Sequence, residues 1–183
     1  MTPPSTGDAV AGRHVVLVGL MGAGKSTVGA LVAARMARPF VDTDELVEVA
    51  AGKTVAEIFA DAGEAAFREL ERVAVDDACA SPEPLVIACG GGAVLDPANR
   101  RAISGAGVVV WLRASVARLA ERVADAAARP LLAGRQPLET LERLQLLRAE
   151  SYEAVADVIL DTDALDAGAV AERVLEEVAA CAA

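Results

Sequence analysis

The sequence predicts an α/β fold, a three-layer α/β/α sandwich built around a five-stranded parallel sheet. Five short apolar runs alternate with segments of helical composition, which is the pattern of a parallel sheet covered by helices. The first apolar run leads directly into a glycine-rich loop that opens a helix. A chain of 183 residues can bury one sizeable core and is short for two, so we expect a single domain.

The predicted strands are continuous apolar runs without alternating polar residues. This pattern is typical of parallel strands that are buried on both faces. The predicted strands span residues 14–20, 40–41, 85–89, 108–112 and 158–160.

The predicted helices carry start and stop signals. Asp44 can cap one helix, Thr54 and Glu57 have capping-box spacing for the next, and Gly63 interrupts that helix. Further helices are predicted over residues 26–37, 45–51, 64–79, 115–125 and 138–152. A short helix is predicted to start at Asp96-Pro97, and a final helix carries Val170, Val174 and Val178.

The predicted domain covers residues 14–180. Residues 1–13 are rich in Pro, Thr, Gly and Ala and are predicted to form a flexible N-terminal extension. They lack the basic start and apolar core of a signal peptide, so we expect a cytoplasmic protein. The connection at about 126–137 holds two prolines and a glycine and is predicted to be a mobile lid.

The composition excludes several function classes. The net charge is −10 and the pI is near 4.6, which argues against nucleic acid or an anionic membrane as partner. Uncharged stretches reach only 12 residues, too short to span a bilayer. Three cysteines without metal-ligand spacing predict reduced thiols. The only histidine, His14, precedes the first strand, where a structural role is expected.

Residues 19–26, Gly-Leu-Met-Gly-Ala-Gly-Lys-Ser, form a P-loop motif between a strand and a helix. In such a loop backbone N–H groups wrap the phosphates of ATP, Lys25 reaches the β and γ oxygens, and the Ser26 hydroxyl binds Mg²⁺. Only two of the 17 basic residues are lysine, and one of them stands where the motif requires it. The predicted ATP-binding residues of the loop are Gly22, Ala23, Gly24, Lys25, Ser26 and Thr27.

Asp42 and Asp44 follow the second predicted strand. Their spacing directs both carboxylates to the ligand-bearing edge of the sheet, where one can serve magnesium and the other a substrate hydroxyl. The same tripeptide recurs at residues 161–163, where we expect only turn and capping chemistry.

Two further motifs have a structural and a functional interpretation. Arg68 and Glu71 lie one helical turn apart, and this spacing alone favours an exposed ion pair over an arginine oriented to bind a carboxylate. The triple glycine at 90–92 ends the third strand. It is expected to expose three N–H groups to a closely packed ligand, and a tight strand-to-helix turn is the structural alternative.

Arginines supply the remaining candidate cations. Arg129, within the predicted lid, is a candidate to close over the transferring phosphoryl group, and a plain surface loop is the alternative. Arg118 and Arg122 lie four residues apart on a predicted helix, where a solvated face is the default and stacking on a base is the alternative.

With the P-loop, Asp-x-Asp, Phe-Arg-x-x-Glu, triple glycine and Arg-Pro-Leu-Leu motifs in this order, the chain resembles the shikimate kinases over residues 14 to about 180. The resemblance implies a P-loop fold like that of the nucleoside monophosphate kinases, with a mobile lid. It also implies Mg²⁺-dependent transfer of the ATP γ-phosphoryl group to the 3-hydroxyl of shikimate, on the pathway to chorismate and aromatic amino acids. The implied partners are ATP and shikimate, without nucleic acid or membrane, and we predict a monomer.

The resemblance also implies roles for particular residues. Asp44 resembles the residue that holds the shikimate hydroxyls and accepts the reacting proton, and Asp42 the carboxylate that positions magnesium together with Ser26. Arg122 aligns with the arginine that stacks on adenine, and Arg129 with the lid arginine on ATP. The implied shikimate-binding residues are Asp44, Arg68, Gly90, Gly91, Gly92 and Arg148.

The sequence departs from the family pattern in two places. Residues 163–167, which often include an arginine in the family, read Asp-Ala-Leu-Asp-Ala, and the lid after Arg129 is longer and carries Arg135. A gluconate or nucleoside kinase is the rival enzyme. A GTPase is excluded because its Asn-Lys-x-Asp motif is missing, and the intact Lys25 and Ser26 give no support for a non-catalytic binding module.

Overall fold

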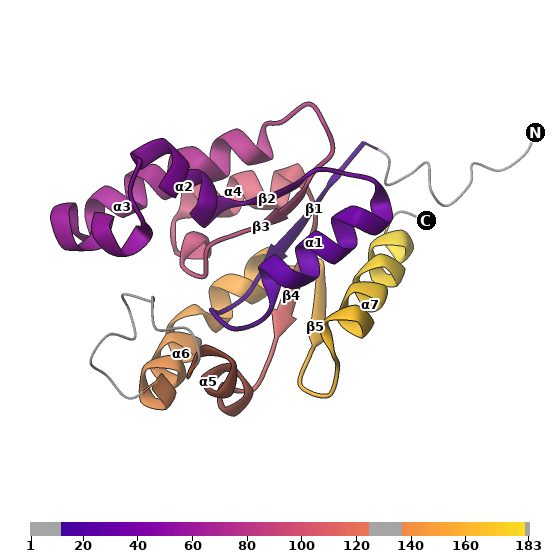
Figure 1. Cartoon of the computed structure of the whole chain (residues 1–183). Helices are drawn as coiled ribbons and strands as arrows, with labels where there is room; N and C mark the ends of the chain where they lie inside the picture. The colour runs from indigo at the N-terminus through magenta and orange to yellow at the C-terminus, as the bar shows by residue number, and fades with distance from the viewer. Residues whose placement is uncertain (1–11, 125–136, 182–183) are drawn as a thin grey trace, which may run out of the picture.

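A five-stranded parallel sheet forms the centre of the protein in the computed structural model, which describes residues 12–124 and 137–181 (Figure 1). The strand order is β2-β3-β1-β4-β5, and every pairing is parallel. The strands are β1 (His14–Val18), β2 (Phe40–Asp42), β3 (Val86–Ala88), β4 (Gly107–Arg113) and β5 (Val158–Asp161). The predicted fold class and all five predicted strands are confirmed.

Helices cover both faces of the sheet. The helices are α1 (Lys25–Met36), α2 (Thr43–Ala51), α3 (Val55–Cys79), α4 (Pro97–Ala106), α5 (Val116–Ala124), α6 (Pro137–Val155) and α7 (Ala167–Ala180), with a 3₁₀ turn η1 at Ala93–Leu95. The α1 and α7 helices pack together on one face, and α4 and α6 pack together on the other (Figure 1). This arrangement is the predicted three-layer sandwich.

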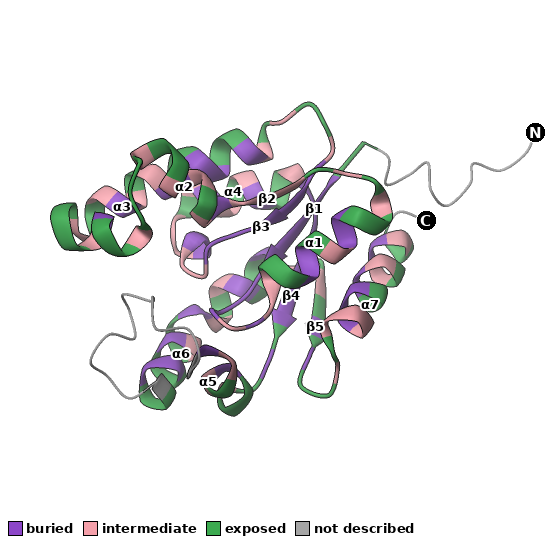
Figure 2. Cartoon of the chain, in the orientation of Figure 1, coloured by how far each residue is buried: buried purple, intermediate pink, exposed green. Residues whose placement is uncertain are grey.

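The central strands are fully enclosed by these helices (Figure 2). All residues of β1 and β3 are buried, as are all of β4 except its last. Continuous apolar runs form these strands because both of their faces meet helices. The edge strands β2 and β5 are more exposed.

Helix boundaries agree with the predicted capping signals at three positions. Thr54 and Glu57 form the predicted capping box, Asp96 caps α4, and Gly63 breaks the helical geometry inside α3 with φ of 79°. The prediction for α2 was wrong. Asp42, not Asp44, is its N-cap, because the Asp42 carboxylate accepts a hydrogen bond from the Asp44 N–H at 3.0 Å. Asp44 therefore lies in the first turn of α2.

The carboxyl ends of β1, β2 and β3 meet at one edge of the sheet. The P-loop follows β1, Asp42 ends β2, and the triple glycine follows β3, so three of the predicted motifs are brought together by the topology. No helix in the described ranges is long and apolar enough to cross a membrane. Most of the predicted N-terminal extension and nearly all of the predicted lid, including Arg129 and Arg135, lie outside the described residues.

Candidate nucleotide and acceptor site

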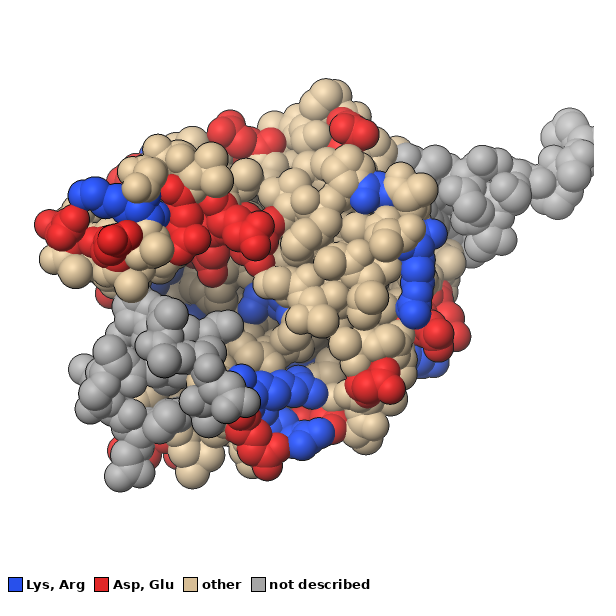
Figure 3. Space-filling model, viewed as in Figure 1, with Lys and Arg blue, Asp and Glu red and all other residues tan. Residues whose placement is uncertain are grey.

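A cavity of about 830 Å³ opens at this edge of the sheet. It is lined by the P-loop, α2, α3, the loop after β3, α5, α6 and the start of α7. Figure 3 shows acidic side chains gathered on the rim over α2 and α3, with basic side chains inside the hollow and on the opposite rim near α5. A protein with a strongly negative net charge thus gathers cations where an anionic ligand would bind.

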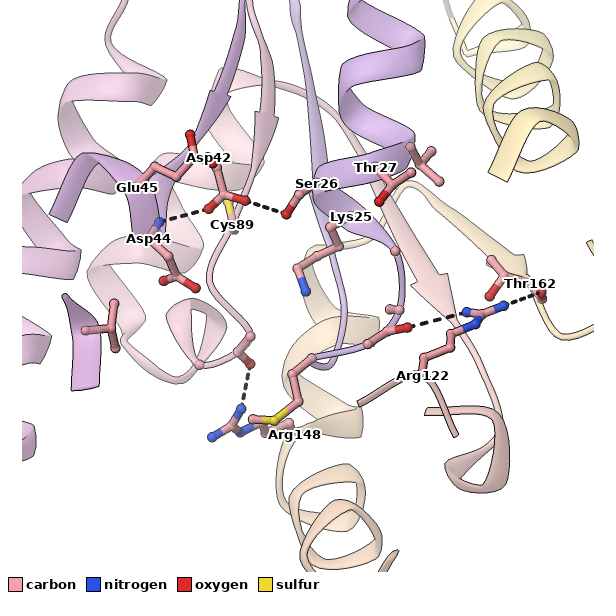
Figure 4. Close-up of a pocket in the computed structure, with 18 of the residues that line it drawn as sticks. Lys25, Ser26, Thr27, Asp42, Asp44, Glu45, Cys89, Arg122, Arg148 and Thr162 are labelled. Atoms are coloured by element: carbon pink, nitrogen blue, oxygen red, sulfur yellow. Dashed lines mark hydrogen bonds between the residues drawn. The ribbon is translucent and has the colours of Figure 1, made fainter. Parts of the chain in front are cut away.

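The P-loop takes the backbone path that its glycines permit. Gly22 has φ of 82° and Gly24 has φ of 90°, values that side-chain-bearing residues rarely adopt. The α1 helix begins at Lys25, so its first N–H groups and its positive dipole end face the cavity. All six predicted ATP-binding residues of the loop line this cavity. Lys25 projects into it (Figure 4), with Nζ donating to the Leu20 carbonyl at 3.0 Å.

Ser26 and Asp42 meet at the side of the cavity next to the P-loop. The Ser26 hydroxyl donates to Asp42 Oδ2 at 2.5 Å (Figure 4). A hydroxyl and a carboxylate are hard oxygen ligands, and Mg²⁺ in such sites takes few protein ligands and completes its octahedron with phosphate oxygens and water. The described residues contain no cluster of three or more His, Cys, Asp or Glu that could hold a metal. The pair therefore suits a magnesium ion carried in with a triphosphate.

Two carboxylates lie against Gly90. They belong to the part of the cavity formed by α2, α3, the loop after β3 and α6, which is called the acceptor side below. A Cβ atom on Gly90 would lie 2.5 Å from Asp44 Oδ1 and 2.8 Å from Glu71 Oε1, so a side chain at this position would displace both. Glu71 is 1% exposed. Burial raises the pKa of Glu71 to about 7, with the Arg68 cation lowering it and the Asp44 carboxylate adding to the rise.

Arg68 is held by three acceptors. Its Nη1 donates to Glu71 Oε2 at 3.3 Å and to the Gly92 carbonyl at 3.0 Å, and its Nη2 donates to Glu64 Oε1 at 2.8 Å. The expectation of an exposed Arg68–Glu71 ion pair is wrong. The Glu71 side chain is buried because α3 packs against the loop after β3 at this position. Arg68, which Glu71 orients, lines the cavity.

Arg148 lies on the opposite side of the same loop and is 3% exposed. Its Nη1 donates to the Gly91 carbonyl at 2.8 Å (Figure 4), which also accepts from the Tyr152 hydroxyl at 2.5 Å. The Nε–H of Arg148 is buried and has no hydrogen-bond partner within the described structure. A buried donor left without an acceptor is costly. Arg148 as a residue is part of the cavity lining.

The triple glycine contributes in a different way from the one predicted. The Gly90 N–H is not presented to a ligand, because it donates to the buried Thr43 hydroxyl at 2.8 Å. Instead, the Gly91 carbonyl accepts a hydrogen bond from Arg148, and the Gly92 carbonyl accepts one from Arg68. Gly91 and Gly92 line the cavity, and Gly90 lies beneath it. The run of glycines permits this because side chains here would meet Arg68, Asp44 and Glu71.

Arg122 connects the P-loop with the segment after β5. Its guanidinium donates to the carbonyls of Gly22 and Thr162, both at 3.4 Å (Figure 4). Arg118 also lines the cavity but pairs with Glu121 at the surface. The apolar residues Leu165, Ala167 and Val170 form the adjoining wall.

The expectation of only turn and capping chemistry at residues 161–163 is wrong, because Asp161 and Asp163 both bind residues 48 positions away in the sequence. Asp163 accepts from the Ser115 N–H at 2.8 Å, just before α5, and Asp161 pairs with Arg113. Thr162 also lines the cavity, which its sequence context did not indicate.

His14 and the cysteines have structural surroundings. His14 Nδ1 accepts from the Leu85 N–H at 2.9 Å, and burial lowers its pKa. Cys79, Cys89 and Cys181 are free thiols. Burial raises the pKa of Cys89, which keeps this cavity-lining thiol protonated and unreactive. These observations agree with the structural roles expected from the sequence.

Comparison with known proteins assigns the family. The family model for shikimate kinase matches residues 21–179. The chain belongs to the shikimate kinase family. A shikimate kinase of Symbiobacterium thermophilum is 46% identical over 166 residues, covering 90% of this chain and 95% of that protein. Another, from Paramagnetospirillum magneticum, is 46% identical over 165 residues, covering 90% and 84%.

Solved structures agree with this assignment. A shikimate kinase from Acinetobacter baumannii in complex with shikimate superposes with a TM-score of 0.91 at 32% identity, covering 97% of this chain and 98% of that one. A gluconokinase from Sinorhizobium meliloti has a TM-score of 0.61 at 23% identity, a likeness that shows the fold alone. The fold of this shikimate kinase family member is therefore that of its family.

Several cavity residues of this shikimate kinase family member were missed by sequence reasoning. Val55, Phe59 and Phe67 form an apolar wall on the acceptor side, with the two phenylalanine rings 4.9 Å apart. Glu64 was also missed. Phe67 precedes Arg68 in a motif already singled out, and that proximity was the available signal. The others lie on helices whose orientation depends on packing.

Proposed function

We propose that this protein is a shikimate kinase that transfers the γ-phosphoryl group of ATP to the 3-hydroxyl of shikimate. The observation that carries the acceptor assignment is the pair of guanidiniums, Arg68 and Arg148, that line the same cavity and are held by neighbouring carbonyls of the glycine loop. A carboxylate bound beside these two cations would accept charge-assisted hydrogen bonds from them. Family membership makes shikimate, which carries one carboxylate, the acceptor to test first.

Arg68 and Arg148 bind the shikimate carboxylate from two sides of the loop after β3. Both guanidiniums are oriented by carbonyls of that loop, so little side-chain freedom is lost when the acceptor binds. The ring of shikimate then packs on the apolar wall of Val55, Phe59 and Phe67. Asp44, in the first turn of α2, holds the ring hydroxyls and accepts the proton of the reacting one.

The P-loop binds the triphosphate at the other end of the cavity. Its N–H groups and Lys25 neutralise the phosphate oxygens as negative charge moves from the γ- to the β-phosphate. Ser26 and Asp42 would hold magnesium, which would supply neutralisation of the phosphate charge. Arg122 lies next to the adenine base of ATP. Phosphoryl transfer needs positioning and charge neutralisation, and this set of residues supplies both.

Coupled measurement of ADP release tests the proposal. Purified protein with ATP and magnesium should release ADP with shikimate and much less with gluconate, which also has a carboxylate and hydroxyls but no ring to fill the apolar wall. The methyl ester of shikimate should be a poor acceptor. Absence of shikimate-dependent turnover, or equal turnover with gluconate, would overturn the assignment.

A further inference from the structure

The guanidinium of Arg68 is already occupied before any acceptor enters. Both hydrogens of Nη1 are directed to fixed partners, the Glu71 carboxylate and the Gly92 carbonyl. Nη2 donates to Glu64 Oε1 at 2.8 Å, shorter than the 3.3 Å contact to Glu71. A guanidinium has five N–H donors in a fixed plane. An incoming carboxylate that needs two parallel donors must therefore use the Nη2 side, where Glu64 lies.

The charges around Arg68 also indicate that an acceptor carboxylate must compete for this arginine. Two arginines, Arg68 and Arg148, face three carboxylates, Asp44, Glu64 and Glu71. An anionic acceptor gains little from a site in which carboxylates outnumber the cations. One of the carboxylates must leave or become neutral for the acceptor to be attracted.

Glu64 is the carboxylate that can leave. Its side chain is 59% exposed, whereas the Glu71 side chain is 2% exposed. Glu64 directly follows Gly63, where α3 is interrupted, and it lines the same cavity as Arg68. It can rotate into water at low cost, since exposed ion pairs are weak. Glu71 cannot, because it is enclosed by protein.

We propose that Glu64 is an internal competitor for the acceptor carboxylate: it holds the Nη2 side of Arg68 in the empty site and is displaced when the acceptor binds. This role rests on the proposed function, in which Arg68 binds the carboxylate of shikimate. Glu64 thereby sets the affinity for shikimate through an exchange of one carboxylate for another. It is a positioning residue, and it takes no part in the chemical step.

The test compares wild type, Glu64→Gln and Glu69→Gln. Gln keeps the size of Glu and removes its charge. Glu69 is the matched control, because it lies on the same helix in an ion pair with Arg72 and is 72% exposed but does not line the cavity. Calorimetric titration with shikimate gives the dissociation constant, steady-state kinetics separate KM from kcat, and the methyl ester of shikimate is the ligand without a carboxylate.

Loss of the competitor should tighten shikimate binding to Glu64→Gln about two- to fivefold, or about 0.4 to 1 kcal/mol, the range of an exposed ion pair. The fall in KM should exceed any change in kcat. Glu69→Gln should bind like wild type, and the methyl ester should bind wild type and Glu64→Gln equally.

Unchanged or weaker shikimate binding by Glu64→Gln would overturn the proposal, because Glu64 would then be a bystander or a support for Arg68. Equal tightening for shikimate and its methyl ester would also overturn it. If the proposed function is wrong, the result differs, because wild type will then neither bind nor phosphorylate shikimate.

Discussion

Glu71→Gln removes a carboxyl group that the fold holds in an unfavourable place. Glu71 is almost completely buried beside Arg68, with the Asp44 carboxylate on the same side of Gly90. The Gln side chain keeps the shape and can still accept from Arg68, but it does not ionise. Comparison of the two proteins therefore isolates the free energy of ionising one buried carboxyl group.

The pKa of Glu71 gives the magnitude. Burial raises this pKa from the ordinary value of 4.5 to about 7. The folded state thus binds the proton more tightly than the unfolded state, so the group destabilises the protein progressively as the pH rises from about 4.5 to 7. Each pH unit in that window corresponds to about 1.4 kcal/mol, which makes the total loss about 3 kcal/mol. Below the window both states are protonated, and above it both are ionised.

Urea denaturation at a series of pH values from 4.5 to 8 measures this effect. The free energy of unfolding of Glu71→Gln minus that of wild type should increase by about 3 kcal/mol across the series. Titrating groups that do not interact with Glu71 cancel in the difference. Glu69→Gln, a substitution of an exposed carboxylate on the same helix, is the control for the loss of one charge from the surface of α3. A constant difference for Glu71→Gln would refute the reasoning.

Three further predictions concern the two halves of the cavity. Arg148→Lys keeps the charge but loses the Nε–H and the planar fork, so KM for shikimate should rise about tenfold or more, whereas a rise confined to KM for ATP would contradict the assignment. Asp42→Asn should raise the Mg²⁺ concentration for half-maximal activity about tenfold, since it removes a charged oxygen ligand; an unchanged Mg²⁺ profile would exclude Asp42 from the ion site. Gly22→Ala places a Cβ 2.8 Å from Val123 Cγ1 at positive φ and should lower the free energy of unfolding by about 2 kcal/mol or more in a thermal melt. Gly52→Ala, also at positive φ but with open space around the new atom, should cost less, and equal losses would show that the contact with Val123 has no effect.

Features encoded by neighbouring residues were predicted well from the sequence. The P-loop needs glycines at particular steps, a lysine and a hydroxyl, all within eight residues, so its spacing alone indicates the ligand. The strands were equally readable because a continuous apolar run predicts burial on both faces. The capping box at Thr54 and the break at Gly63 were predicted for the same reason, since each depends on contacts within one turn of helix.

Features that depend on distant residues were decided by the tertiary structure. Arg148 reaches the Gly91 carbonyl across 57 positions of sequence, and Glu71 is buried only because the loop after β3 packs over α3. Spacing along one helix could not separate this buried carboxylate from an exposed ion pair. The sequence by itself determined the fold class, the phosphate loop and the kinds of side chain in the site. Packing determined which of those side chains are buried, which carbonyls orient the arginines and which carboxylate can move away. Desolvation and hydrogen-bond geometry exist only once the segments are folded together.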